Sequence, residues 1–313
     1  MGKAILECGV PRGELFLTTK VWITNAGYEK AKMSIEESLR ELKTDYLDYY
    51  LLHALQAGNY KKYDEYHIWD FVKEQKEKGL IKHWGFSFHA GPDILDEILT
   101  KHPDAEFVQL QLNYADWENP DVTARANYEV ARKHGKSIIV MEPVKGGALA
   151  NPPKAVQDIF RKANPEASFA SWAIRYVASL EGIITVLSGM SNVAQMEDNL
   201  SYMKQFKVLD AEEQDAIRQA QEVINGIKSI PCTGCHYCTA GCPKQIPIPE
   251  IFEARNKQLV WGQLEQGKAE YAKAVADVGT ASDCIACGQC ERACPQQIPV
   301  IDRLKDCATA FGK

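Results

Sequence analysis

The cysteines are concentrated in one part of the chain. Nine of the ten lie between residues 232 and 307. Eight of those nine form two copies of the pattern C-x2-C-x2-C-x3-C-P, namely Cys232, Cys235, Cys238 and Cys242, and Cys284, Cys287, Cys290 and Cys294. The second copy follows the first at an offset of 52 residues, and Ile246-Pro247 recurs at the same offset as Ile298-Pro299. The repetition indicates an internal duplication.

The spacing of these cysteines suits iron–sulfur chemistry. Three cysteines separated by two residues each wrap the backbone around a small inorganic core, so that each sulfur reaches a different iron. The fourth cysteine follows a longer step, and in the bacterial two-cluster arrangement it binds the other cluster. The segment resembles a bacterial-type ferredoxin with two [4Fe–4S] clusters. That resemblance implies one cluster on Cys232, Cys235, Cys238 and Cys294, and another on Cys284, Cys287, Cys290 and Cys242.

Three other interpretations of the cysteines compete. Disulfides form in oxidising compartments, whereas the first residues lead into no apolar segment typical of a signal peptide. Zinc usually takes paired cysteines from two places, and a third cysteine two residues further on does not fit that pattern. Chance does not produce the same spacing twice. Cys8 and Cys307 lie outside the pattern, and we expect both to be buried core thiols.

Composition limits the classes of partner. The 313 residues include 36 Lys+Arg against 42 Asp+Glu, and this net charge of -6 argues against a nucleic-acid partner held by a basic surface. No apolar run approaches the ~20 residues that span a bilayer, which argues against a membrane protein. The hydrophobic fraction of 45% is typical of globular domains, and the length suits about two of them. We expect a cytoplasmic protein.

Residues 1–228 alternate between short β-type runs and helical patterns. The β-type runs lie at residues 15–21, 46–52, 82–87, 107–112, 137–141 and 183–187. Such alternation indicates a parallel sheet with helical crossovers, and the absence of G-x-G-x-x-G after the first strand argues against an open dinucleotide-binding sheet. Single helices are expected over 65–78 and 250–276. The predicted fold is α/β: an incomplete TIM-type (β/α)8 barrel of about six units over 1–228, followed by a small ferredoxin-like iron–sulfur domain over 229–313.

Several segments of the first 191 residues resemble the aldo-keto reductase family. They are LFLTTK at 15–20, SIEESLREL at 34–42, DYLDYYLLH at 45–53, MEPVKGGAL at 141–149 and LSGMS at 187–191. Together with the cysteine repeats, they resemble the branch of the family that carries a C-terminal ferredoxin-like domain. The resemblance implies a (β/α)8 barrel with its active site at the carboxyl ends of the strands, and hydride transfer between a nicotinamide and a carbonyl carbon.

The family works with a tetrad of Asp, Tyr, Lys and His, and this sequence keeps two of the four. Lys20 matches the lysine that lowers the tyrosine pKa, and His53 matches the histidine that orients the carbonyl. The family Asp and Tyr lie ahead of the lysine strand, but residues 1–19 contain neither. We therefore expect the chain as printed to be inactive in carbonyl reduction. We also expect a longer native chain to supply the first two βα units, because a barrel without them has two unpaired sheet edges.

The nucleotide site of the family is partly retained. The resemblance assigns to it Ser87, Gln111, Gly146, Gly147, Ser188, Gly189, Met190, Ser191, Gln195 and Asn199. Backbone N–H groups at the start of the helix after 187–191 favour an anion, and the two glycines permit close approach of a pyrophosphate. Ser87 and Gln111 could equally be strand polar groups that bond to neighbouring backbone. NAD(P) is the expected cofactor, and the choice between NAD and NADP stays open.

Two hypotheses of function follow. In the first, the protein is an NAD(P)-dependent oxidoreductase acting on a small-molecule carbonyl substrate, with an attached electron-transfer domain. In the second, it is an iron–sulfur electron carrier or interaction protein for a redox partner protein, and the barrel is non-catalytic. The retained Lys20 and His53 favour the first, whereas the missing Asp and Tyr favour the second. Nicotinamides transfer two electrons as hydride and each cluster takes one, so direct coupling normally needs a flavin or another splitter.

Overall fold

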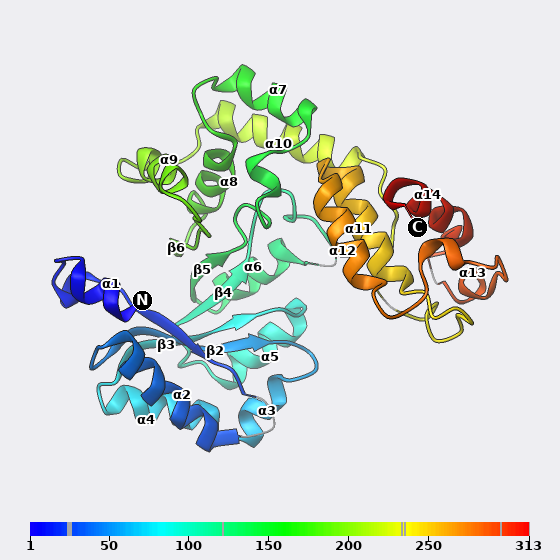
Figure 1. Ribbon diagram of the computed structural model, residues 1–313. Coiled ribbons are helices and arrows are strands. Elements are labelled where there is room, and N and C mark those ends of the chain that lie inside the picture. Colours follow the sequence, from blue (N-terminus) through cyan, green and yellow to red (C-terminus); the bar gives the residue numbers. More distant parts are fainter. Residues whose placement is uncertain (24–26, 121, 233, 235, 295, 313) are drawn as a thin grey trace. The chain divides into compact units, whose positions relative to one another are not determined.

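The chain divides into two compact units. The computed structural model describes residues 1–313 except 24–26, 121, 233, 235, 295 and 313. The first unit comprises residues 1–146 and 170–209, and the second comprises 147–169 and 210–313 (Figure 1). The cysteine repeats therefore share a compact unit with a segment from the middle of the chain.

A six-stranded parallel sheet forms the centre of the first unit. Its strands are β1 (Thr18–Val21), β2 (Leu47–Leu55), β3 (Ile81–Phe88), β4 (Phe107–Gln111), β5 (Ser137–Met141) and β6 (Ile183–Val186). They lie side by side in sequence order, and every neighbouring pair is parallel. The predicted incomplete barrel of six βα units is confirmed. Among the described residues, β1 and β6 are the two edges of the sheet.

Helices pack against the outer face of this sheet. They are α2 (Gly27–Leu42), α3 (Tyr60–Glu65), α4 (Ile68–Glu77), α5 (Pro92–Lys101), α6 (Ala124–Lys133) and α8 (Phe169–Ala178). The first unit also contains α1 (Gly2–Glu7), η1 (Arg12–Glu14, a 3-10 turn) and α9 (Val193–Met203), whose described residues lie outside the apolar core. Outward-facing strand residues such as Tyr50 and Phe86 pack with helix residues such as Ile35 and Leu99 in one large apolar core. Burial of this apolar surface is the main force that holds the helices on the sheet.

The inner face of the sheet carries a smaller apolar cluster. Leu51, Phe107 and Ile139, from three different strands, pack against one another there. Side chains alternate between the two faces of a strand, so His53 shares the face of Leu51 and Gln111 shares the face of Phe107. Both lie nearer the carboxyl ends of their strands, which is where a barrel of this type carries its active site.

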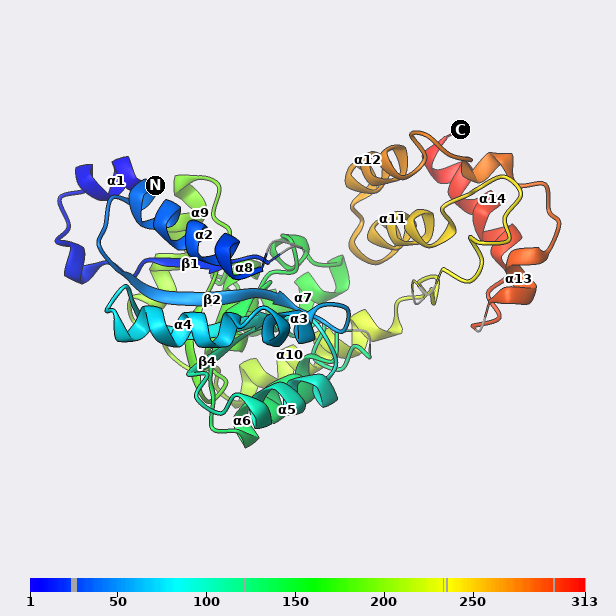
Figure 2. The ribbon, with the colours of Figure 1, turned by 90° about the horizontal axis from the view of Figure 1, so that it is seen from below.

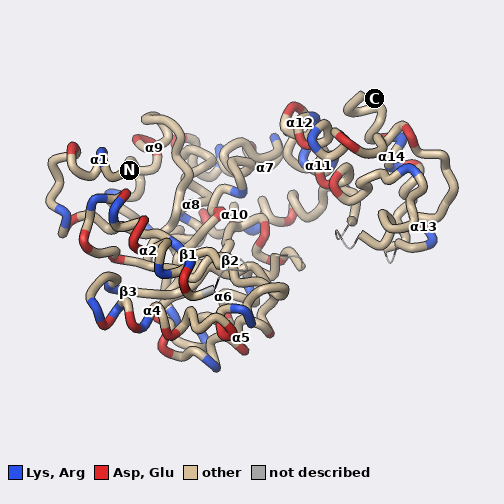
Figure 3. Tube along the Cα trace, turned by 60° about the horizontal axis from the view of Figure 1, so that its bottom comes forward, with Lys and Arg blue, Asp and Glu red and all other residues tan. Residues whose placement is uncertain are grey.

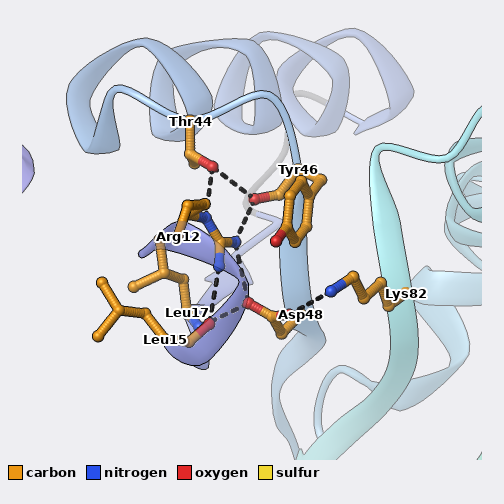
Figure 4. Close-up of polar contacts among 7 residues, drawn as sticks. All are labelled: Arg12, Leu15, Leu17, Thr44, Tyr46, Asp48 and Lys82. Carbon is orange, nitrogen blue, oxygen red and sulfur yellow. Dashed lines mark hydrogen bonds and ion pairs between the residues drawn. The ribbon is translucent and has the colours of Figure 1, made fainter. Parts of the chain in front are cut away.

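A buried carboxylate connects the segment before β1 with the amino ends of β2 and β3. Asp48 Oδ2 lies 2.9 Å from the Arg12 guanidinium, and its Oδ1 lies 2.9 Å from Lys82 Nζ (Figure 4). The Leu17 N–H donates to the same carboxylate at 2.9 Å. Both cations also lie over the ring of Tyr46. Burial acts to raise the pKa of Asp48, but the bonds from Leu17, Lys82 and Arg12 together hold it below its ordinary value.

The second unit is helical. Its elements are η2 (Ala148–Ala150), α7 (Lys154–Ala163), α10 (Ala211–Gly226), α11 (Ile248–Trp261), α12 (Leu264–Ala274), η3 (Ala281–Asp283), α13 (Gln289–Ala293) and α14 (Val300–Phe311). Helix α7 packs beside α10, and α11 packs beside α12 (Figures 1 and 2). Ile251, Phe252 and Leu304 are buried in its apolar core, which also contains cysteines of both repeats.

Left-handed residues limit two of the predicted helices. The predicted helix over 65–78 is present as α4, which begins at Ile68 because His67, with a φ of 53°, precedes it. The segment 250–276 is divided between α11 and α12 by Gly262, whose φ is 66°. A left-handed residue ends a helix because it turns the chain out of the i to i−4 ladder. The prediction of one continuous helix is wrong at Gly262, although this glycine was an available signal.

The two cysteines outside the repeats differ from each other. Cys307 is fully buried, as expected, but Cys8 is exposed, so the prediction of a core thiol is wrong for Cys8. Its helix α1 buries only Gly2 and gives Cys8 no apolar cover.

Charged residues of both signs occur throughout the described part of each unit. Acidic and basic residues are interspersed along the helices of each unit (Figure 3). No helix in the described part of the chain is long and apolar enough to cross a membrane.

Candidate functional site

The first recess of the second unit collects cysteines from both repeats. It is lined by Cys232, Cys238 and Cys294, together with apolar residues such as Phe252 and Ile298. Cys232 and Cys238 belong to the first motif, whereas Cys294 is the last cysteine of the second. The predicted fourth member, Cys235, lies outside the described residues.

The second recess has the reciprocal composition. It is lined by Cys284, Cys287 and Cys290 of the second motif and by Cys242, the last cysteine of the first. The N–H of Ile246 donates to Cys242 Sγ at 3.5 Å. Cys290 is buried, and burial raises the pKa of its thiol. The cysteines are therefore grouped in the crossed way that the ferredoxin resemblance implies.

Both recesses present the donors of a cluster site. The described part of the first contains three cysteine thiols and the second contains four. Among the described residues, no three His, Cys, Asp or Glu side chains converge closely enough for a single metal ion. Thiolates are the usual ligands of iron–sulfur clusters, so the composition of each recess suits such a cluster.

The backbone of the two repeats has the same local conformation. Left-handed residues occur at Gly234, His236 and Gln245, and again 52 residues later at Ala286, Gly288 and Gln297. Backbone hydrogen bonds repeat at the same offset: Gln245 N–H donates to the Cys242 carbonyl, and Gln297 N–H donates to the Cys294 carbonyl. The duplication seen in the sequence therefore extends to the chain path around each recess.

Lys20 and His53 lie at the carboxyl ends of β1 and β2. Lys20 is opposite Leu51, which is two residues before His53 on the same face. Burial lowers the pKa of Lys20. Burial also lowers the pKa of His53, with further contributions from the positive charge of Lys20 and from His89. The structure thus brings the two predicted catalytic residues within electrostatic reach of each other.

The irregular carboxyl end of β2, directly after His53, is held by three side chains. Ala54 has a φ of 56°, a left-handed conformation that its Cβ disfavours. Its N–H donates to Ser87 Oγ at 2.7 Å, and its carbonyl accepts from Asn59 Nδ2 at 2.9 Å. The Tyr63 hydroxyl donates to the His53 carbonyl at 2.5 Å. Ser87, predicted as a nucleotide contact, is here bonded to the neighbouring strand, and sequence reasoning missed the two other residues.

Gln111 belongs to a buried polar network that the sequence analysis also missed. Asp116, only 1% exposed, accepts from Gln111 Nε2 at 3.3 Å and from Asn113 Nδ2 at 2.8 Å. It is also paired with Lys145 Nζ at 2.5 Å. Asn113 donates in addition to the Glu142 carbonyl at 3.1 Å. The network joins the loops after β4 and β5, and a signal for it was the run of polar residues directly after two strands.

The loop between β6 and α9, together with the first turns of α9, contains six of the predicted nucleotide residues: Ser188, Gly189, Met190 and Ser191 in the loop, and Gln195 and Asn199 in the helix. Asn192 caps α9, because its side chain accepts from the Gln195 N–H at 3.0 Å. Gln195 Oε1 in turn accepts from the Ser191 N–H at 2.7 Å. Asn199 Nδ2 donates to Ser188 Oγ at 2.9 Å. The predicted residues therefore lie together in a loop that is ordered by its own side chains.

Gly146 and Gly147, the two remaining predicted residues, follow β5 in left-handed conformations, with φ of 59° and 92°. The Gly146 N–H donates to Glu142 Oε2 at 2.8 Å. Gly147 is the first residue of the second unit. Glycine is favoured at both positions because a Cβ strains the left-handed conformation.

Family comparisons agree with both parts of the chain. Residues 1–222 match the aldo/keto reductase family, and residues 231–298 match the 4Fe-4S dicluster domain. The chain is similar to methylglyoxal reductase DkgB of Salmonella typhi, with 30% identity over 218 residues that cover 69% of this chain and 76% of the relative.

Solved structures share the fold of the barrel region. An aldo/keto reductase from Brucella melitensis has a TM-score of 0.56 and 25% identity over 70% of this chain and 77% of its own. An aldo-keto reductase from Klebsiella pneumoniae, solved in complex with NADPH, has a TM-score of 0.55 and 22% identity over 70% and 74%. This chain belongs to the aldo/keto reductase family, as an oxidoreductase of that family that carries a 4Fe-4S dicluster domain.

Proposed function

We propose that this protein transfers electrons through two [4Fe–4S] clusters carried next to an NAD(P)-binding aldo/keto reductase unit. The observation that carries the proposal is the composition of the two recesses, each of which combines cysteines of one motif with the last cysteine of the other. A bound cluster supplies one-electron storage at each recess. The residues proposed to hold the clusters are Cys232, Cys235, Cys238 and Cys294 for the first, and Cys284, Cys287, Cys290 and Cys242 for the second.

The proposal includes a nucleotide in the first unit. The ordered loop at Ser188–Asn199 offers the capped N-terminus of α9, where backbone N–H groups favour a phosphate. The relative from Klebsiella pneumoniae was solved with NADPH, which supports a nicotinamide nucleotide as the ligand. Gln111 and Ser87 already bond to protein groups. We therefore expect them to shape the nucleotide site and to offer the ligand only their remaining polar atoms.

We propose further that the 313 residues do not reduce carbonyl compounds by the family mechanism. Residues 1–19 contain no Asp and no Tyr. Tyr49 packs with the inner cluster, but it precedes His53 by four residues and so lies toward the amino end of β2. Lys20 and His53 would orient a small carbonyl, the substrate class that the name methylglyoxal reductase gives for a relative. Among the described residues, Tyr63 places its phenol on the His53 carbonyl at 2.5 Å, but this side chain is fully buried and its hydroxyl is engaged with backbone. We therefore propose that Tyr63 does not deliver the proton.

Two further parts of the proposal concern boundary and location. We place the junction between the reductase and iron–sulfur parts at residue 228, between the two family matches. Cysteines that bind iron must remain reduced, so the proposed location is a reducing compartment such as the cytoplasm.

The crossed ligation is tested with single cysteine variants of the full chain. Cys294→Ser should abolish the first cluster and spare the second, whereas Cys242→Ser should do the reverse. Each variant should lose about half of the iron, and the EPR spectrum of the reduced protein should lose one of its two components. Cys307→Ser is the matched control, because this buried thiol lies outside both recesses. Loss of both clusters in Cys307→Ser, or of neither in Cys294→Ser, contradicts the assignment.

The nucleotide and the carbonyl reaction need separate measurements. NADPH fluorescence titration should show saturable binding, weakened by Asn192→Ala, which removes the α9 cap. Methylglyoxal with NADPH should give no turnover above the rate without protein. Turnover in this assay would overturn the proposed inactivity and leave the cluster assignment standing.

A further inference from the structure

The two recesses differ in charge at one pair of equivalent positions. Lys244 lines the second recess, two residues after Cys242. Its equivalent at the offset of 52 residues is Gln296, which lines the first recess two residues after Cys294. Both side chains are exposed at the rim. A cation therefore borders one recess at the place where a neutral amide borders the other.

The backbone holds these two residues in corresponding places. The residues that follow them, Gln245 and Gln297, have the same left-handed φ of 52°. On the second recess the position is also packed from outside, because Gly279 lies directly against Lys244. A Cβ on Gly279 would stand 2.1 Å from the Lys244 carbonyl oxygen, so only glycine permits this approach. The backbone of Lys244 is thus held at the rim by the packing of Gly279 as well as by the nearby Cys242.

Other charged groups stand near both recesses. Beside the second, Asp283 accepts from the Thr280 N–H at 2.8 Å, and Glu291 accepts from the Ile301 N–H at 3.0 Å. Arg292 lies against Gly288 and carries a positive charge there. The formal charges of these three residues sum to minus one.

Near the first recess, Glu250 contributes a charge of minus one, with its carboxylate 3.8 Å from His236 Nδ1. Asp302, the equivalent of Glu250 at the offset of 52 residues, is paired with Lys305 Nζ at 3.0 Å.

Lys244 itself lies within electrostatic reach of Asp283. Among the described residues that line the two recesses, Lys244 is the one Lys or Arg, and its equivalent position in the other repeat is neutral.

We propose that Lys244 makes the two clusters electronically unequal by raising the reduction potential of the cluster in the second recess. This inference rests on the proposed ligation of both clusters. Reduction adds negative charge to a cluster, and a nearby cation stabilises the reduced form more than the oxidised form. The Ile246 N–H bond to Cys242 Sγ acts in the same direction. A single added electron then resides mainly on the cluster in the second recess.

The expected size of the effect is modest. Lys244 is exposed, so water and salt screen its charge. The distribution of one electron between the two clusters should favour the second cluster by about three- to tenfold more with Lys244 than with glutamine at that position.

The test is a redox titration of the full chain followed by EPR, with Lys244→Gln, Lys244→Arg and Gln296→Lys. The transition that disappears in Cys242→Ser identifies the second cluster. Lys244→Gln should lower the potential of that transition alone, and Lys244→Arg should restore it because the charge returns. Gln296→Lys should raise the potential of the other transition and reduce the difference between the two. Higher ionic strength should shrink each shift.

The outcomes separate this inference from the function on which it rests. Fewer than two one-electron transitions in the unaltered chain would overturn the proposed ligation and the inference together. Two transitions that stay unchanged in Lys244→Gln would overturn the inference alone. Equal shifts of both transitions, or an unrestored potential in Lys244→Arg, would also overturn it, because they indicate a structural change and not a local charge.

Discussion

The cysteine recesses of the second unit and the strand-end site of the first unit differ in how many of their expected functional residues are present. In the second unit, each described cysteine of the two motifs lines a recess, and the donor types match the cluster that the domain match indicates. In the first unit, Lys20 and His53 face the carboxyl end of the sheet, but the printed sequence ahead of them supplies no Asp or Tyr. The second unit groups seven of the eight motif cysteines among the described residues, with Cys235 outside them, whereas in the first unit we propose that Lys20 and His53 form only part of a catalytic set.

The two regions also differ in how their polar groups are satisfied. The polar groups around the strand ends are bonded to one another: Ser87 accepts from the Ala54 N–H, and Asp116 is paired with Lys145. Such bonds satisfy buried groups without any ligand. Cysteine thiols are weaker hydrogen-bonding groups, and the bond from the Ile246 N–H to Cys242 Sγ is long, at 3.5 Å. The dependence on a bound group should therefore be stronger in the second unit, and four predictions measure that contrast.

Removal of the clusters should have the largest effect. Stripping the iron from the full chain with a strong chelator should unfold the region 230–311, because cysteines such as Cys238 and Cys290 are part of its apolar core. Metal binding and folding are coupled in sites of this kind. Hydrogen exchange read by mass spectrometry should show loss of protection there, with the strands β2–β5 still protected. Equal loss of protection in both units would contradict the contrast.

Asp48→Asn should have an intermediate effect, confined to the first unit. The carboxylate is buried and bonded to Arg12, Lys82 and the Leu17 N–H (Figure 4). Its loss should cost about 1–3 kcal/mol of the free energy of unfolding, at the lower end of what breaking a buried pair costs because Arg12 and Lys82 are partly exposed. Denaturant unfolding measures this loss, and cluster content should stay unchanged.

The same carboxylate should give a pH dependence of known sign. The pKa of Asp48 is lowered in the folded state, so its contribution is complete above the ordinary aspartate pKa of about 3.9 and is lost as the pH falls below that value. Asp48→Asn should remove this part of the acid sensitivity. The control is Asp45→Asn, an exposed carboxylate in the preceding turn. An equal change in both variants would refute a specific role for Asp48.

Lys20→Gln should have the smallest effect, a rise in the pKa of His53. Burial is the main cause of the low pKa of His53, and the Lys20 charge adds to it, so removing the cation removes only one contribution. An NMR titration of the His53 ring protons measures the change. Lys82→Gln removes an equal charge at the amino end of β3 and should leave His53 unaffected. No rise in Lys20→Gln would mean that the two residues do not share an environment.

Much of the fold could be predicted from local patterns. The six strands and their order follow from the alternation of apolar runs and helical patterns, since parallel neighbours need helical crossovers. The break at Gly262 was missed because helical patterns continue on both sides of it, and the start of α4 was placed three residues too early. Tyr63 and Asn59 were missed because their partners, the carbonyls of His53 and Ala54, are backbone groups that no sequence motif marks.

The sequence by itself determined the donor set: eight cysteines at two identical spacings, a lysine and a histidine at two strand ends, and a lysine in one repeat where the other repeat has a glutamine. These are local features, and spacing along the chain is enough to define them. Only the tertiary structure decided that Cys294 joins Cys232 and Cys238, and that Lys244 and Gln296 border different recesses. Such groupings depend on how the two repeats pack, because they join residues more than fifty positions apart.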